Sequence, residues 1–140
     1  MILLIDTLAI VFLILCWWVA LGAYPRLPEK IPVHFGISGE PDNWGGRWMI
    51  FLMPVIATLI VAMNWFIFTR TKGSPKMPAA MELPLHLLHL ELPALFTYIT
   101  WRMTEVAFGR AQGLGVWFLP VILLVMTGTS AWMIVAGKTN

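Results

Sequence analysis

The stretch MILLIDTLAIVFLILCWWVALGAY, residues 1–24, decides how the rest of the sequence is interpreted. A helix needs about twenty mainly apolar residues to cross the hydrocarbon core of a bilayer. This run is interrupted only by Asp6 and Thr7. It has no preceding basic segment and no A-x-A-like cleavage site, so it predicts a retained membrane span and not a signal peptide.

The composition and the remaining apolar windows extend this prediction to the whole chain. The 140 residues are 59% hydrophobic and 11% charged, with a mean hydropathy of +0.82. Backbone groups in lipid must be hydrogen-bonded within the segment, which favours helices. The sequence therefore predicts an all-α integral membrane protein with one domain, residues 1–140. Its four-transmembrane-helix bundle would have spans at about 2–23, 48–68, 83–107 and 115–136.

Residues 25–47, between the first two apolar windows, have a different character. Prolines at 25, 28 and 32 predict an extended, polyproline-like path, and Gly36, Gly39 and the tetrad EPDN at 40–43 supply turn residues. We expect a structured Pro/Gly-rich loop on the extracytoplasmic side, in which His34 could pair with Asp42 or Glu40. Its motif residues are Pro32, His34, Gly39, Pro41, Asp42, Trp44 and Gly45.

Two strings carry a resemblance to a known family. LPEKIPVHFGISGEPDNWGGRW, residues 27–48, resembles the pattern LPxxIPxHFxxxGxPDxWG of the bacterial membrane family known as domain of unknown function 1648. LELPALFTYITWRMTEVAFGRAQGLGVWFLPVILLVMTGT, residues 90–129, is similar to the second half of its stand-alone members. The same domain begins the larger SdpI-like immunity and signalling proteins. The resemblance implies a membrane location and little chemistry.

The distribution of Lys and Arg predicts the orientation in the bacterial cytoplasmic (inner) membrane. Each side of the membrane would carry four cations. Three of them, Arg70, Lys72 and Lys76, are packed into the connection 69–80, and such clusters favour the cytoplasmic side. We therefore expect both termini to be cytoplasmic.

The third apolar window has the most polar residues. At about 100° per residue, Glu91, Tyr98, Arg102 and Glu105 share one stripe of a helix, whereas Glu82, His86 and His89 fall on nearly the opposite one. Ionisable residues at membrane depth are costly and face a partner or a cavity. The window therefore predicts a helix with two packing surfaces.

Three interpretations remain open for the histidine stripe. Glu82, His86 and His89 could bind zinc or iron, because they recur at i, i+4 and i+7. His86 or His89 alone could be the axial ligand of a haem or a chlorophyll-type pigment held together with a partner subunit. The simplest interpretation is a pair of hydrogen-bonded histidines. Lipid is another possible ligand of the chain.

The opposite stripe also allows alternatives. Glu91 could be a structural, hydrogen-bonded carboxyl group, or it could serve a proton relay or bind a cation. Arg102 and Glu105 are spaced for a local ion pair, and Arg102 could also contact the first loop.

Several functional classes are disfavoured by the sequence. A net charge of +2 with scattered cations argues against nucleic-acid binding, and the single cysteine, Cys16, precludes an intrachain disulfide. No phosphate loop or nucleophile motif is present, so we expect no enzymatic activity.

The preferred function is a non-catalytic scaffold or accessory subunit of a larger membrane complex. Small residues near and along the fourth span would admit a helix of a membrane protein partner or of a second copy. They are Gly113, Gly115, Gly128, Ser130 and Ala131. One alternative is an immunity- or sensor-like protein, and another is a proton or cation pathway through an oligomer that uses Glu91.

Overall fold

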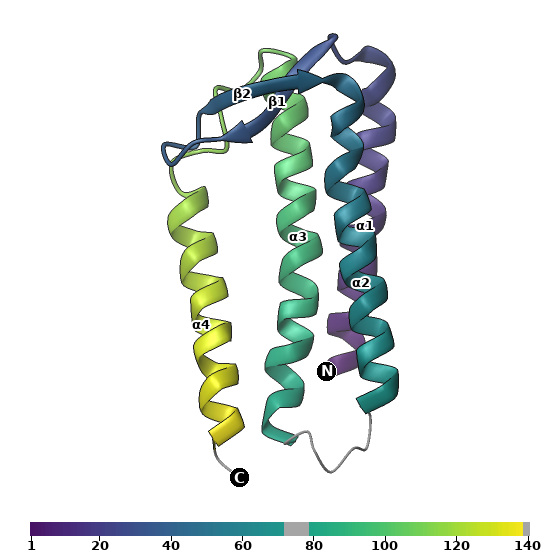
Figure 1. Cartoon of the computed structure of the whole chain (residues 1–140), viewed down its shortest axis with the longest axis vertical. Helices are drawn as coiled ribbons and strands as arrows, with labels where there is room; N and C mark the ends of the chain where they lie inside the picture. The colour runs from purple at the N-terminus through teal and green to yellow at the C-terminus, as the bar shows by residue number, and fades with distance from the viewer. Residues whose placement is uncertain (72–78, 139–140) are drawn as a thin grey trace.

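The computed structural model describes residues 1–71 and 79–138, and its architecture is mostly helical. Four long helices run side by side along the longest axis: α1 (Ile2–Ala23), α2 (Leu52–Thr71), α3 (Glu82–Ala107) and α4 (Phe118–Lys138) (Figure 1). The N-terminus and the C-terminal end of α4 lie at one end of the molecule. These helices overlap the four apolar windows of the sequence.

The expectation of an all-α protein is wrong between α1 and α2. Strands β1 (Lys30–Phe35) and β2 (Pro41–Gly46) form a two-stranded antiparallel sheet at the end opposite the termini (Figure 1). Short 3-10 helices, η1 (Tyr24–Arg26) and η2 (Arg47–Phe51), connect this hairpin to α1 and α2. Pro25 therefore lies in a helical turn and not in an extended path.

The hairpin turn lies earlier than the EPDN tetrad. The Gly36 amide donates to the Glu40 carbonyl at 2.8 Å, and Gly39 has a φ of 80°, which glycine adopts without steric cost. Pro41 consequently begins β2, opposite Phe35. An edge strand tolerates proline because the missing amide is not needed by a second neighbour.

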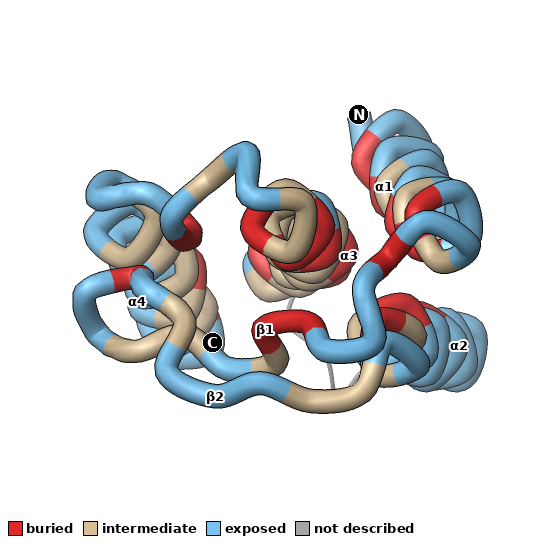
Figure 2. Tube along the Cα trace, turned by 90° about the horizontal axis from the view of Figure 1, so that it is seen from above, coloured by how far each residue is buried: buried red, intermediate tan, exposed pale blue. Residues whose placement is uncertain are grey.

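The central helix is α3. Seen from above, α1 and α2 lie on one side of α3 and α4 on the other (Figure 2). α3 contacts all three other helices, most extensively α1, whereas α4 packs mainly on α3. The hairpin spans from the α1–α2 side towards α4, and β1 contacts α3.

The apolar core lies beneath the hairpin, where α1, η2 and α3 converge. Its buried residues are Ala20, Ala23, Leu27, Ile31, Ile50 and Met103. The tilted rings of Tyr24 and Phe51 pack beside it at 4.9 Å between centroids, and the Arg47 guanidinium lies over the Tyr24 ring. The hairpin end is therefore packed around a buried apolar core, as a soluble protein is.

Along the four helices, the distribution of apolar and polar side chains is the reverse of that in a soluble protein. Large apolar side chains of α1, α2 and α4 are exposed, while the buried side chains of α3 include His86, His89, Thr100 and Thr104. Among the described residues, three helices are long and apolar enough to cross a membrane, spanning Ile2–Arg26, Arg47–Arg70 and Phe118–Lys138. Polar groups of the least apolar helix are thus enclosed by three apolar helices.

Candidate functional site

The candidate functional site follows the two polar faces of α3. One face turns towards α1 and α2, and the other towards α4, as the helical spacing of the sequence predicts. Each face meets polar groups that lie far away in the sequence.

On the α1 side, His86 pairs with Asp6. The His86 Nδ1 and Asp6 Oδ1 atoms are 2.6 Å apart, and the two side chains are 11% and 24% exposed. Phe68 of α2 packs against the His86 ring, with 4.3 Å between centroids, and contacts His89 edge-on at 5.5 Å. His89 is 2% exposed, and its Nδ1 has no hydrogen-bond partner among the described residues.

Asp6 was not among the site residues predicted from the sequence. It is the only acidic or basic side chain in the apolar part of the first span, and such a group needs a partner at membrane depth. That signal could have pointed to a polar contact for Asp6, but it does not identify His86 as the partner.

The metal set predicted at Glu82, His86 and His89 is not assembled. His86 turns to Asp6, and Glu82 is exposed at the start of α3. In the described ranges 1–71 and 79–138, no three His, Cys, Asp or Glu side chains lie close enough together to hold a metal ion. The axial-ligand role of His86 or His89 stays a prediction.

Further polar contacts join α1 to its neighbours nearer the hairpin. The Thr97 hydroxyl donates to the Phe12 carbonyl at 2.7 Å, and Cys16 Sγ lies 3.4 Å from the Thr100 hydroxyl. Because these groups face one another inside the protein, α1 and α3 keep their polar atoms paired in an apolar surrounding.

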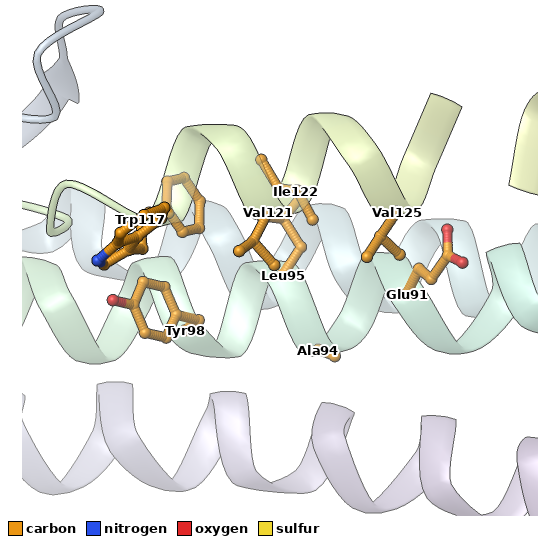
Figure 3. Close-up of a pocket in the computed structure, with 9 residues that line it drawn as sticks. Glu91, Ala94, Leu95, Tyr98, Trp117, Val121, Ile122 and Val125 are labelled. Atoms are coloured by element: carbon orange, nitrogen blue, oxygen red, sulfur yellow. The ribbon is translucent and has the colours of Figure 1, made fainter. Parts of the chain in front are cut away.

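On the α4 side, Glu91 lies in a cleft of about 410 Å³ between α3 and α4 (Figure 3). Thr129 of α4 donates its hydroxyl hydrogen to Glu91 Oε1 at 2.5 Å. The other oxygen, Oε2, is buried and has no hydrogen-bond partner among the described residues. The lining is otherwise apolar or aromatic: Ala94, Leu95, Tyr98, Trp117, Phe118, Val121, Ile122 and Val125.

Beyond the cleft, α3 holds the segment that leads to α4. The Tyr98 hydroxyl donates to the Leu114 carbonyl at 2.6 Å, and Arg102 donates from Nε, at 2.7 Å, and from Nη2 to the Gly113 carbonyl. The Leu114 amide in turn donates to the Gly39 carbonyl of the hairpin turn at 2.7 Å. Arg102 therefore reaches the hairpin through this segment.

The expected Arg102–Glu105 ion pair is wrong. Glu105 accepts hydrogen bonds from Arg110, at 2.9 Å from Nε and 2.6 Å from Nη2. The chain reverses at Gly109, whose φ of 71° suits glycine, and this brings Arg110 back over the end of α3. The hydrogen bonds to Glu105 raise the pKa of the Arg110 guanidinium above its ordinary value.

The hairpin motif forms a second, exposed cluster. His34 Nδ1 lies 2.6 Å from Asp42 Oδ1, and these side chains are 67% and 52% exposed. Pro32 is buried, Trp44 is exposed, and a Cβ added at Gly45 would touch the Val33 side chain at 2.9 Å. Most residues of the motif thus have a structural role in the hairpin.

This architecture defines a mostly helical protein with a β-hairpin at one end, and its apolar helices indicate a membrane protein. Residues 11–58, which cover the second half of α1, the hairpin and the start of α2, match the family described as domain of unknown function (DUF1648). This match confirms the resemblance to that family seen in the sequence.

One relative is an uncharacterized protein of Archaeoglobus fulgidus, 36% identical over 121 residues. The aligned region is 84% of this chain and 58% of that protein, so the chain spans little more than half the length of this relative. No solved structure matches the chain.

Proposed function

We propose that the chain is a non-catalytic scaffold or accessory subunit of a membrane complex, which binds a partner through α4 and the adjoining hairpin turn. All four helices would cross the cytoplasmic membrane. α3 would be the fourth span, because its polar groups face α1 and α4 and so avoid lipid.

In this arrangement, the hairpin lies on the extracytoplasmic side and both termini lie in the cytoplasm. The proposal rests on the cation cluster at Arg70, Lys72 and Lys76. Lys72 and Lys76 lie outside the described residues.

The observation that best supports a partner site is the exposed outer face of α4. This helix packs mainly on α3 and leaves an exposed stripe of Leu124, Gly128, Ala131 and Val135. A Cβ added at Gly128 would meet nothing within 4 Å in the chain, so a partner helix can approach the backbone closely there. Near the end of the same helix, Ile37, Val116 and Trp117 expose apolar side chains on two segments joined by a hydrogen bond.

A matched pair of substitutions tests this proposal. Gly128→Leu places bulk on the exposed stripe of α4, and Gly22→Leu places the same bulk on α1, where a Cβ also meets nothing within 4 Å. The size of the complex that contains a tagged chain would be measured by native electrophoresis of mildly solubilised host membranes. We expect Gly128→Leu alone to release the chain from its larger complex, either with another membrane protein or with a second copy. Equal migration of both variants with the unmodified protein would contradict the proposal.

A further inference from the structure

The cleft between α3 and α4 is suited to a small ligand. Its volume of about 410 Å³ falls within the range of pockets that bind small molecules. Figure 3 shows its two ends: Glu91 and Val125 at one, Tyr98 and Trp117 at the other, with Leu95, Val121 and Ile122 between them. A single carboxyl group therefore lies at one end of an otherwise apolar cleft.

The carboxyl group of Glu91 is only half satisfied. Thr129 occupies Oε1, while Oε2 is buried without a donor from the described residues. A buried polar atom that lacks a partner is destabilising, and more so when the group is charged. No lysine, arginine or histidine lines the cleft to compensate a negative charge. The site thus lacks both a hydrogen-bond donor and a positive charge.

At the opposite end of the cleft, the Tyr98 hydroxyl group has no hydrogen left to donate to a ligand. The Tyr98 hydroxyl hydrogen is already donated to the Leu114 carbonyl, and the Tyr98 ring stacks on Phe118 with 5.1 Å between centroids and 8° between planes. Trp117 adds an exposed indole beside them. This end therefore offers aromatic surface, which suits an apolar or aromatic group.

We propose that the cleft binds a lipophilic amine, whose protonated nitrogen donates to the Glu91 carboxyl group once this side chain turns into the cleft, and whose apolar body extends along Leu95 and Val121 to the aromatic end. Glu91 and Tyr98 are seven positions apart on α3, which corresponds to about 10 Å along a helix. The ligand is consequently an elongated molecule with its ammonium group at one end.

The ammonium group is favoured over other polar ends for two reasons. It supplies the missing donor and the missing charge together, and charge-assisted hydrogen bonds are roughly twice as strong as neutral ones. A lipid acyl chain would fill the apolar part of the cleft but would leave Oε2 without a donor. This inference does not depend on a partner at the outer face of α4.

Three matched probes test the inference on the full chain in phosphatidylcholine nanodiscs. They are 6-phenylhexylamine, its N,N,N-trimethyl derivative, which has the charge but no N–H donor, and 6-phenylhexanol, which has a donor but no charge. Binding would be measured by saturation-transfer NMR, with empty nanodiscs as the background for partition into lipid. We expect the amine to bind about tenfold or more tightly than either analogue.

Substitutions then locate the site. Glu91→Gln should weaken amine binding by about tenfold or more, because a neutral amide replaces the carboxyl group. Glu82→Gln, which removes an exposed carboxyl group from the same helix, should leave it unchanged. Val125→Phe should weaken all three probes, since this half-exposed side chain lies beside Glu91 (Figure 3). Far-UV circular dichroism would check that each variant folds.

Four results would overturn the inference: equal binding of the three probes, equal binding of amine and alcohol, amine binding that is indifferent to Glu91→Gln, or no binding above empty nanodiscs. Equal binding of the three probes would show that the cleft binds apolar molecules without selecting their polar group. The second would show that a donor without charge is sufficient.

Discussion

His86 of α3 and Asp6 of α1 are 80 positions apart in the sequence, yet their side chains approach to 2.6 Å between Nδ1 and Oδ1. The pair lies in the part of the molecule where apolar side chains face outward and polar ones inward. It shows how α3 can carry an ionisable group among three apolar helices, because His86 meets its partner on a neighbouring helix.

The stability of this pair should depend on its burial. Asp6→Ala removes the partner of a mostly buried histidine, and we expect a loss of about 1–2 kcal/mol in the free energy of unfolding. Reversible unfolding with dodecyl sulfate in mixed micelles, followed by tryptophan fluorescence, would measure it.

The His34–Asp42 pair is a matched control, because the same two atom types lie at the same 2.6 Å distance. Both side chains are largely exposed there, so Asp42→Ala should cost less than about 1 kcal/mol. Equal losses in the two variants would show that burial does not set the strength of the Asp6–His86 pair.

The contact between Gly113 and the hairpin turn should be intolerant of a side chain. A Cβ at Gly113 would collide with the Gly39 carbonyl group, which also accepts the Leu114 amide hydrogen. We expect Gly113→Ala to cost about 1–3 kcal/mol through overpacking, and to expose the hairpin to limited proteolysis. Gly22→Ala, which meets open space, should behave like the unmodified chain. A protease-resistant hairpin in Gly113→Ala would argue against this docking.

The two arginines near the end of α3 should differ in importance. Arg102 holds the Gly113 carbonyl through two donors, whereas Arg110 forms an exposed pair with Glu105. Arg102→Met should lower stability by about 1–3 kcal/mol because it leaves a partly buried carbonyl without its charged donor. Arg110→Met should change stability by less than about 1 kcal/mol. Thermal unfolding in detergent would rank the two, and a larger loss for Arg110→Met would reverse our assignment.

The sequence was sufficient to predict the helices and the two polar faces of α3. The length of each apolar window predicts a helix, and the helical period of about 3.6 residues places Glu91 on a different face from His86 and His89. The partners of these residues could not be predicted, because Asp6 and Thr129 come from helices whose rotation depends on packing. The histidine stripe therefore left a metal set, an axial ligand and a hydrogen-bonded pair of histidines open, whereas in the structure His86 pairs with a carboxylate from α1.

Errors in the loops have a different cause. Residues 25–47 were expected to form a structured loop with a polyproline-like path because of the prolines at 25, 28 and 32. A two-stranded sheet nevertheless accommodates Pro32 and Pro41, because it leaves outward amides unused. Glu105 was assigned to Arg102 from spacing alone, although the reversal at Gly109 brings Arg110 closer. Turn geometry, not helical periodicity, determines both outcomes.

The crossing of the membrane by α3 is the central claim, and labelling of single introduced cysteines tests it most directly. Cys16 is buried and can remain as an unlabelled background. Cysteines at Ile37, Ala80 and Val116 would be treated in intact cells with a membrane-impermeant maleimide, before and after permeabilisation. All three side chains are exposed. We expect labelling of Ile37→Cys and Val116→Cys in intact cells, and of Ala80→Cys only after permeabilisation. Labelling of Ala80→Cys and Val116→Cys from the same side would contradict the claim that α3 crosses the membrane.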